Sequence, residues 1–101
     1  MPRPTRGAQD AAKRALAWVD AGYGGDGLTR TGLARANQLA NGRNISEDTI
    51  QRMRSFFARH SSNRANSYDL RDGEPTPWRV AWDLWGGDAG RQWVEQKKFE
   101  R

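Results

Sequence analysis

The stretch "WRVAWDLWGGDAGRQW", Trp78–Trp93, holds four of the five tryptophans in a chain of 101 residues. Trp78, Trp82 and Trp85 follow one another at intervals of four and three residues, so they share one face of a helix. The positions beside them on that face are also apolar. A stripe of large apolar side chains at helical spacing is typical of a buried core. The stretch therefore predicts a helix whose tryptophans pack inward.

Residues on either side of this stripe indicate where the helix begins and ends. Thr76 can cap its N-terminus, and Pro77 suits the first helical position. The pair Gly86–Gly87 is expected to stop the helix, because glycine readily leaves the helical conformation. Asp88 is then predicted to cap a last helix that ends near Lys98.

The last helix carries further apolar residues. Trp93 and Val94 are predicted to face inward, since they lie beyond the glycine turn at positions that meet the preceding helix. Trp93 would then fold back against Trp82 or Trp85. The two helices are therefore expected to form a Trp-rich helical hairpin.

Three more helices are predicted upstream, and no run of useful length alternates as a strand does. Their expected ranges are Arg6–Ala21 with Thr5 as its cap, Thr31–Asn41, and a helix capped by Ser46 that ends near His60. A glycine-rich loop over Tyr23–Gly27 and a long polar connection after His60 separate them. The predicted class is all-α, a compact bundle of about five short helices. Its organisation is a flexible arm over 1–5, a single helical domain over 6–98 and a tail over 99–101.

The composition favours an anionic partner. Lys and Arg number 17 against 12 for Asp and Glu, which gives a net charge of +5. Most of the basic residues are arginine, whose guanidinium makes paired contacts to phosphate and carboxylate. Nucleic acid, an acidic protein and simple solubility are all compatible with this balance. We expect a soluble protein with no membrane partner, because no apolar run approaches a membrane span.

The sequence offers no enzyme site, metal site or cofactor site that chemistry supports. The chain has no cysteine, and His60 is its one histidine. A zinc site needs three or four such ligands, and Ser61 beside His60 is not the geometry of a catalytic triad. His60 is interpreted as a partly cationic residue that suits the C-terminal end of its helix. The expected protein is therefore not an enzyme.

Leu33–His60 is predicted to be a helix-turn-helix-like pair. The second helix begins "SEDTIQRMR", and Thr49, Gln51 and Arg52 would point outward toward bases or phosphates. Two features argue against a standard major-groove reader. The turn around "GRN" is longer than usual, and Glu47 and Asp48 would repel phosphate at the end of the helix that normally enters the groove.

The two objections to a major-groove reader do not exclude a broader basic face that contacts nucleic acid without entering a groove. The candidate nucleic-acid-binding residues are Arg35, Arg43, Thr49, Gln51, Arg52, Arg54, Arg59 and Arg64. Arg52 and Arg59 are seven residues apart and so share a helix face. An equally weighted interpretation is a solvated face on which nearby acidic residues pair with the arginines.

The segments "GLARANQLANGRNISEDTIQRMRSFFARH" and "PTPWRVAWDLWGGDAGRQW" resemble a small domain encoded by many tailed bacteriophages and prophages. In that family an "RxM…FARH" helix precedes a polar loop and an "AWxLWGGDAGxxW" segment, and the domain occurs alone or attached to phage head proteins, including maturation-protease-like ones. The match covers about Arg6–Trp93. The loop departs from the family, with "SSNRANS" where "EVDK" is common. The resemblance implies a role in the virion or in the host cytoplasm during infection, and it supplies no catalytic residue.

Two partners are therefore expected from the sequence. The favoured partner is DNA, bound mainly through its phosphates by the arginine face. The alternative is a phage head protein or a host protein, bound by an exposed aromatic anchor. The candidate anchors are Trp18, Tyr23 and Trp78.

Overall fold

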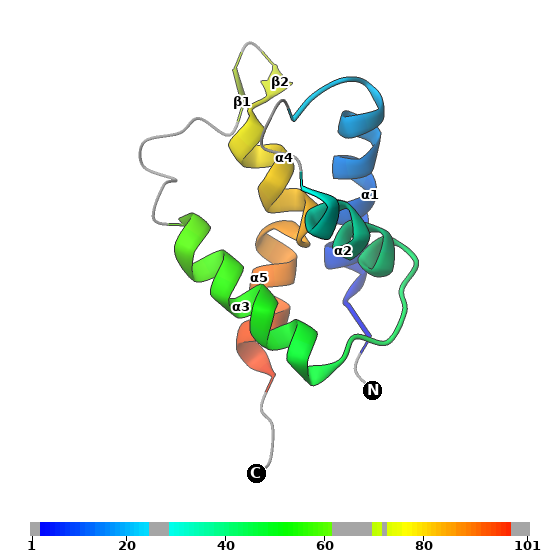
Figure 1. Ribbon diagram of the computed structural model, residues 1–101, viewed down its shortest axis with the longest axis vertical. Coiled ribbons are helices and arrows are strands. Elements are labelled where there is room, and N and C mark those ends of the chain that lie inside the picture. The colour runs from blue at the N-terminus through cyan, green and yellow to red at the C-terminus, as the bar shows by residue number, and fades with distance from the viewer. Residues whose placement is uncertain (1–2, 25–28, 62–69, 72, 98–101) are drawn as a thin grey trace.

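The computed structural model describes residues 3–24, 29–61, 70–71 and 73–97, and their helices confirm the all-α prediction (Figure 1). In chain order the elements are α1 (Arg6–Asp20), α2 (Arg30–Ala40), α3 (Glu47–Ser61), β1 (Leu70–Arg71), β2 (Glu74–Pro75), α4 (Pro77–Leu84) and α5 (Gly87–Gln96). Every helix lies within one or two residues of its predicted range. None of the described helices is long and apolar enough to cross a membrane.

The short hairpin of β1 and β2 was not predicted. Leu70 pairs with Pro75 and Arg71 with Glu74 in antiparallel register, within a region that the sequence indicated as loop. Gly73 turns the chain with a φ of 82°, a conformation that glycine adopts readily. Two-residue strands are too short to produce an alternating pattern, so the sequence carried no signal for them.

Hydroxyl side chains cap the N-termini of four of the described helices. The side chains of Thr5, Thr29 and Thr76 each accept a hydrogen bond from a backbone N–H three residues later. Ser46 does the same for the backbone N–H of Thr49, at 3.2 Å. Each cap satisfies a donor that the first helical turn leaves without a partner. The predicted caps at Thr5, Ser46 and Thr76 are confirmed.

The turn between α4 and α5 uses both glycines. Gly86 has a φ of 111° and Gly87 a φ of 64°. A Cβ at Gly87 would lie 2.7 Å from Oδ1 of Asp83, so a larger residue has no room there. Because Gly86 is the N-cap residue and α5 starts at Gly87, Asp88 lies inside the first turn. The predicted capping role of Asp88 is wrong: its carboxylate instead accepts a hydrogen bond from Nε1 of Trp82 at 2.9 Å.

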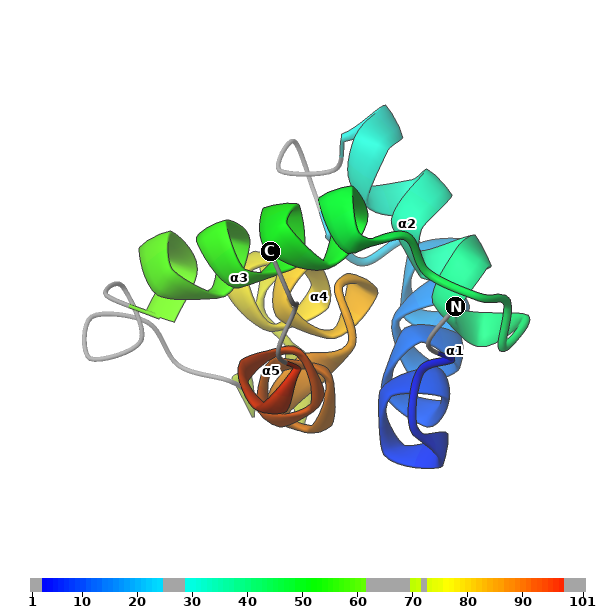
Figure 2. The ribbon, with the colours of Figure 1, turned by 90° about the horizontal axis from the view of Figure 1, so that it is seen from below.

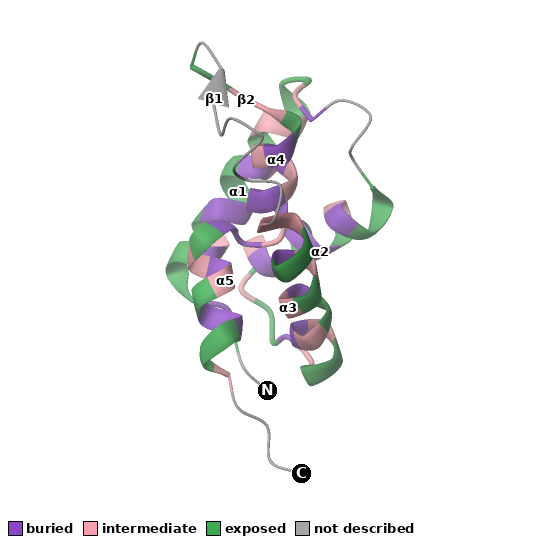
Figure 3. Cartoon of the chain, turned by 90° about the vertical axis from the view of Figure 1, so that its left-hand side faces the viewer, coloured by how far each residue is buried: buried purple, intermediate pink, exposed green. Residues whose placement is uncertain are grey.

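Two helices in succession, α4 and α5, form the middle of the molecule, with α1 along one side and α3 across another (Figures 1 and 2). The side of α1 that faces them is built of alanine, since Ala8, Ala11, Ala12 and Ala15 are all buried. Small side chains allow α1 to approach its neighbours closely. The inner faces of the helices are buried and their outer faces exposed, as Figure 3 shows.

The tryptophans of α4 mostly lie in the core, as predicted. Trp82 is 1% exposed and Trp78 is 7% exposed, whereas Trp85, at the end of the helix, is only half-buried. Trp93 and Val94 of α5 are buried as well. The rings stacked on Trp82 come from Trp78 and from His60 of α3, and Trp93 is buried in the same apolar cluster as Trp82.

Candidate nucleic-acid interface

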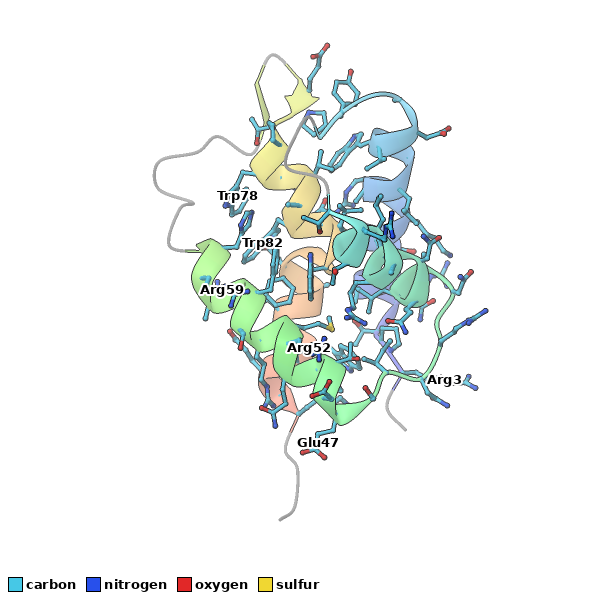
Figure 4. All side chains as sticks on the ribbon, in the orientation of Figure 1. Arg3, Glu47, Arg52, Arg59, Trp78 and Trp82 are labelled. Atoms are coloured by element: carbon cyan, nitrogen blue, oxygen red, sulfur yellow. The ribbon has the colours of Figure 1, made fainter. Side chains whose placement is uncertain are left out.

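Four exposed arginines come from three separate segments and are named here the basic strip: Arg3, Arg43, Arg52 and Arg59. Arg52 and Arg59 lie two turns apart on α3, and Arg43 lies in the connection that precedes α3. Arg3 joins them because its Nε donates to Oδ1 of Asn44 at 3.4 Å. Figure 4 shows Arg52 and Arg59 along α3, with Arg3 beyond the start of that helix.

Acidic side chains lie at the start of the same helix. Nε of Arg52 is 3.2 Å from Oδ2 of Asp48, and both side chains are well exposed, at 65% and 77%. Glu47 precedes Asp48 in the first turn, where the helix dipole favours negative charge. An exposed pair of this kind contributes at most about 1 kcal/mol, so water and other anions compete with it easily. The strip is basic but carries its own acids, as the equally weighted interpretation expected.

Arg54, a predicted phosphate contact, is half-buried rather than exposed, and its guanidinium bonds to backbone carbonyls. Its Nε donates to the carbonyl of Val94 at 2.7 Å, and its Nη2 donates to the carbonyl of Lys97. Arg54 therefore binds the C-terminal carbonyls of α5, which favour a cation. It lies four residues after Ile50, within the buried stripe of α3. Helical spacing alone could have placed it there.

Arg35 is also buried, at 8% exposed, so its prediction as an exposed contact is wrong. It falls in the inward stripe of α2 between Gly32 and Leu39, which are buried too. Its Nη1 donates to Oε1 of Gln38 at 2.5 Å, and its guanidinium lies 5.4 Å from the ring centre of Trp85. The Nε of Arg35 is buried without a hydrogen-bond partner.

The two candidate base-reading residues are poorly placed for that task. Thr49 is half-buried, and its hydroxyl accepts a hydrogen bond from the hydroxyl of Ser46 at 3.0 Å. Gln51 is half-buried as well. Arg64 lies outside the described residues. The connection between α2 and α3 spans residues 41–46, which is longer than the three or four residues of the usual helix-turn-helix.

Behind the basic strip, four rings form a continuous row, named here the aromatic stack: Trp78, His60, Phe56 and Trp85. The ring centres of Trp78 and His60 are 5.2 Å apart, those of His60 and Phe56 4.9 Å, and those of Phe56 and Trp85 4.5 Å. Neighbouring planes differ by 7°, 20° and 9°. Two residues of α3 thus lie between Trp78 of α4 and Trp85 at its C-cap, and Arg35 of α2 lies over the ring of Trp85.

The stack was not predicted as a unit, although its members lie on predicted apolar faces. Phe56 and His60 are four residues apart on α3, and Trp85, the C-cap residue of α4, is seven residues after Trp78. Each pair therefore shares a helix face. The sequence does not show that the two faces meet, because that depends on how α3 crosses the bundle.

His60 is held in the stack by reciprocal hydrogen bonds with Trp78. Its Nε2 lies 3.2 Å from the carbonyl of Trp78, and Nε1 of Trp78 donates to the carbonyl of His60 at 3.0 Å. Burial lowers the pKa of His60, and the hydrogen bond to Trp78 opposes that shift only in part. This lowering of the pKa runs against the partly cationic imidazole expected at the end of the helix.

Of the alternative aromatic anchors, Trp78 is buried in the stack and cannot serve as an exposed anchor. Trp18 and Tyr23 are half-buried. The guanidinium carbons of Arg14 and Arg79 each lie 5.7 Å from the ring centre of Trp18. Trp18 is thus a partly exposed ring flanked by two cations.

Among the described residues, no group of three or more acidic or histidine side chains is arranged to hold a metal ion. No family model matches the chain, and the comparisons with curated proteins and with solved structures return no match either. The resemblance to the phage domain therefore rests on the sequence motifs alone.

Proposed function

We propose that this domain binds the sugar-phosphate backbone of nucleic acid through the basic strip. The observation that carries the proposal is that Arg52 and Arg59 are exposed two turns apart on α3, while Arg3 of the N-terminal arm bonds to Asn44, the neighbour of exposed Arg43. Arg52 and Arg59 are about 10 Å apart along the helix axis, so they can meet different phosphates. The net charge of +5 supports attraction to a polyanion.

The expected binding has little sequence preference. Base edges are read by side chains that project into a groove, whereas arginine contacts to phosphate only position the protein. Thr49 and Gln51 are half-buried, and the hydroxyl of Thr49 is already bonded to Ser46. The remaining exposed donors of the strip are guanidinium groups, which suit phosphate oxygens.

Asp48 limits the affinity without preventing binding. Its carboxylate is exposed and pairs with Arg52, so an entering phosphate competes with it for one guanidinium. Exposed ion pairs are weak, and exchanging one anion for another keeps the charge of Arg52 neutralised. Replacing Asp48 with asparagine should therefore tighten binding.

A fluorescence-anisotropy titration with a labelled mixed-sequence duplex at several salt concentrations tests the proposal. The binding constant should fall steeply with salt, because bound arginines release counterions. The variant Arg52→Gln/Arg59→Gln should bind more weakly, and the slope of log K against log salt should become shallower by about 2.

A matched control separates this face from the overall charge. The variant Lys13→Gln/Arg30→Gln removes the same charge from exposed positions on α1 and at the start of α2. It should keep the wild-type salt slope. Absence of binding at low salt, or equal losses in the two variants, would contradict a role for the basic strip.

The second candidate function is docking on a protein, such as a phage head protein or a host protein. The partly exposed ring of Trp18 between Arg14 and Arg79 favours it, because Trp and Arg are frequent interface anchors. Trp18→Ala would then abolish capture of the partner in a pull-down from infected cells. The Arg52→Gln/Arg59→Gln variant should leave that capture unchanged.

A further inference from the structure

Trp18 is a half-buried ring that lies beside two guanidinium groups from different helices. The Cζ atoms of Arg14 on α1 and Arg79 on α4 each lie 5.7 Å from its ring centre. Among the described residues, Nε1 of Trp18 has no hydrogen-bond acceptor, and it is not one of the enclosed polar atoms. The ring therefore offers a ligand both apolar surface and an N–H donor that water reaches.

A shared carboxylate oxygen holds the two guanidinium groups close together. Nε of Arg14 and Nε of Arg79 both donate to Oδ2 of Asp83, at 3.0 Å and 3.1 Å. These two Nε atoms are therefore at most about 6 Å apart, a span that one oxyanion group can bridge. The side chain of Asp83 is 2% exposed, whereas those of Arg14 and Arg79 are 46% and 25% exposed. Both arginines thus extend from the buried carboxylate to the surface, where a ligand reaches them without rearrangement of the fold.

The terminal nitrogen atoms of Arg14 are the donors that a ligand would meet. Among the described residues, only Nε of Arg14 is engaged in a hydrogen bond, and its side chain is the more exposed of the two. A guanidinium presents its donors as a planar fork that matches the two oxygens of a carboxylate. Arg14, Arg79 and Asp83 together carry one positive charge, which suits one anionic group beside the apolar ring.

Acidic side chains on α1 disfavour a polyanion at this site. Asp10 lies one turn before Arg14 and is 53% exposed, with its Oδ1 3.8 Å from Nε of Arg6. Asp20, the last residue of α1, is exposed as well. A nucleic-acid strand carries a charge on every phosphate, so it would place further negative charge near these carboxylates. A peptide can present one carboxylate to Arg14 with uncharged residues around it, so the charges favour a peptide.

We propose that Trp18, Arg14 and Arg79 form a docking site for an acidic segment of a partner protein, in which a carboxylate lies next to an apolar side chain. The carboxylate of the partner accepts hydrogen bonds from the terminal nitrogen atoms of Arg14, and the apolar side chain packs on the ring of Trp18. Asp83 is a positioning residue, because its Oδ2 holds both arginines beside the ring.

This docking site goes beyond the binding of nucleic acid and does not depend on it. Trp18 lies about 20 Å along α1 from Thr5, the cap next to the arm that carries Arg3. A peptide at Trp18 and a nucleic acid at the basic strip should therefore bind at the same time.

The first experiment titrates nitrogen-15-labelled protein with a short synthetic peptide in which glutamate alternates with leucine and phenylalanine. The indole N–H signal of Trp18, assigned by its absence in Trp18→Leu, should move progressively as the peptide binds. A matched peptide with glutamine at every glutamate should bind about tenfold more weakly, because its hydrogen bonds to Arg14 are no longer charge-assisted. A second matched peptide, with serine at every leucine and phenylalanine, should lose about fivefold because nothing packs on the ring.

Variants of the protein separate the forked donors of Arg14 from its charge. Arg14→Gln should lower the affinity for the glutamate peptide about tenfold. The control Lys13→Gln removes the same charge from the neighbouring exposed position of α1 and should keep the wild-type affinity. Should Arg14→Gln not fold, Trp18→Leu leaves both hydrogen bonds to Asp83 in place. Its affinity, measured by the anisotropy of a labelled peptide, should fall about fivefold.

Several results would overturn the docking site. They are a wild type that binds the glutamate and glutamine peptides equally or not at all, equal losses in Arg14→Gln and Lys13→Gln, and a Trp18 signal that responds to single-stranded DNA but not to the peptide. A duplex titration keeps this test apart from the proposed function. Loss of duplex binding in Arg52→Gln/Arg59→Gln with the peptide affinity unchanged supports two separate sites, whereas duplex binding without peptide binding overturns the docking site alone.

Discussion

Asp83 joins two helices through a single buried carboxylate. Its side chain is 2% exposed, and its Oδ2 accepts hydrogen bonds from Nε of Arg14 on α1 at 3.0 Å and from Nε of Arg79 on α4 at 3.1 Å. Arg14 and Arg79 are partly exposed, so water screens their charges, whereas the carboxylate of Asp83 is enclosed. The carboxylate therefore depends on both cations, and each cation retains access to solvent.

Replacing Asp83 with asparagine should lower the free energy of unfolding by about 2–3 kcal/mol, less than for a fully enclosed pair because the arginines reach water. Urea unfolding followed by circular dichroism measures this. Asp48→Asn removes an exposed pair with Arg52 and should cost less than about 1 kcal/mol. Equal losses in the two variants would contradict the importance of burial at Asp83.

His60 gives the domain a pH dependence with a defined sign. Its pKa in the folded state is lowered by burial, so the fold favours the neutral imidazole. Its contribution to stability is then fully present above the unfolded pKa of about 6.5 and is lost as pH falls through the lower folded value. Stability should decrease from pH 7.5 toward pH 5, and the decrease should be smaller in His60→Gln. Urea unfolding across that range tests it; a wild-type stability that rises on acidification would show that the stack prefers the imidazolium.

At the scale of elements, the sequence could predict those helices whose caps and apolar stripes lie within a few neighbouring residues. The helices over residues 6–20, 30–40 and 47–61 begin at hydroxyl caps and carry apolar stripes, so their type and approximate ends could be read directly. Composition marked Arg35 and Arg54 as surface arginines, but Arg35 is buried in the inward stripe of α2 and Arg54 is half-buried on α3. The aromatic stack depends on two helices that are distant in sequence, and no local rule brings them together.

Gly87, in the turn between α4 and α5, and Gly42 have nearly the same backbone conformation. We expect replacement by alanine to cost different amounts of stability at the two positions. Gly87 has a φ of 64° and Gly42 a φ of 65°. A Cβ at Gly87 would meet Oδ1 of the buried Asp83 at 2.7 Å and Cβ of Ala11 at 3.0 Å. At Gly42 it would meet the movable end of Gln9 at 3.1 Å.

Gly42→Ala should therefore cost only the left-handed conformation, about 1 kcal/mol, whereas Gly87→Ala should cost about 3 kcal/mol or more. Thermal and urea unfolding of the two variants provide the comparison. Because the backbone term is matched, the difference isolates the close approach of Gly87 to Asp83 of α4 and Ala11 of α1. A difference below about 0.5 kcal/mol would mean that Asp83 and α1 can make room for the added methyl group without loss.

At the scale of the whole molecule, α3 is attached mainly through side chains. Arg54 ties it to the end of α5, and Phe56 and His60 insert between the tryptophans of α4. By contrast, α1 packs against its neighbours through its buried alanine face. The basic strip thus lies on a helix whose position depends on the aromatic stack, so the proposed interface and the core are mechanically linked.

Phe56→Leu tests that link, because leucine keeps apolar volume but removes the ring between His60 and Trp85. Two stacking contacts are lost, so the variant should be less stable by about 1–3 kcal/mol and its near-ultraviolet circular dichroism should weaken. Trp18→Leu is the control. Trp18 is a half-buried ring outside the aromatic stack. Its loss should therefore leave the near-ultraviolet circular dichroism of the stack unchanged. If α3 is positioned by the stack, Phe56→Leu should also increase amide hydrogen exchange along α3 more than along α1. Uniform exchange in both helices, or an unchanged near-ultraviolet spectrum, would show that Phe56 merely fills space and that α3 is held by its contacts with α5.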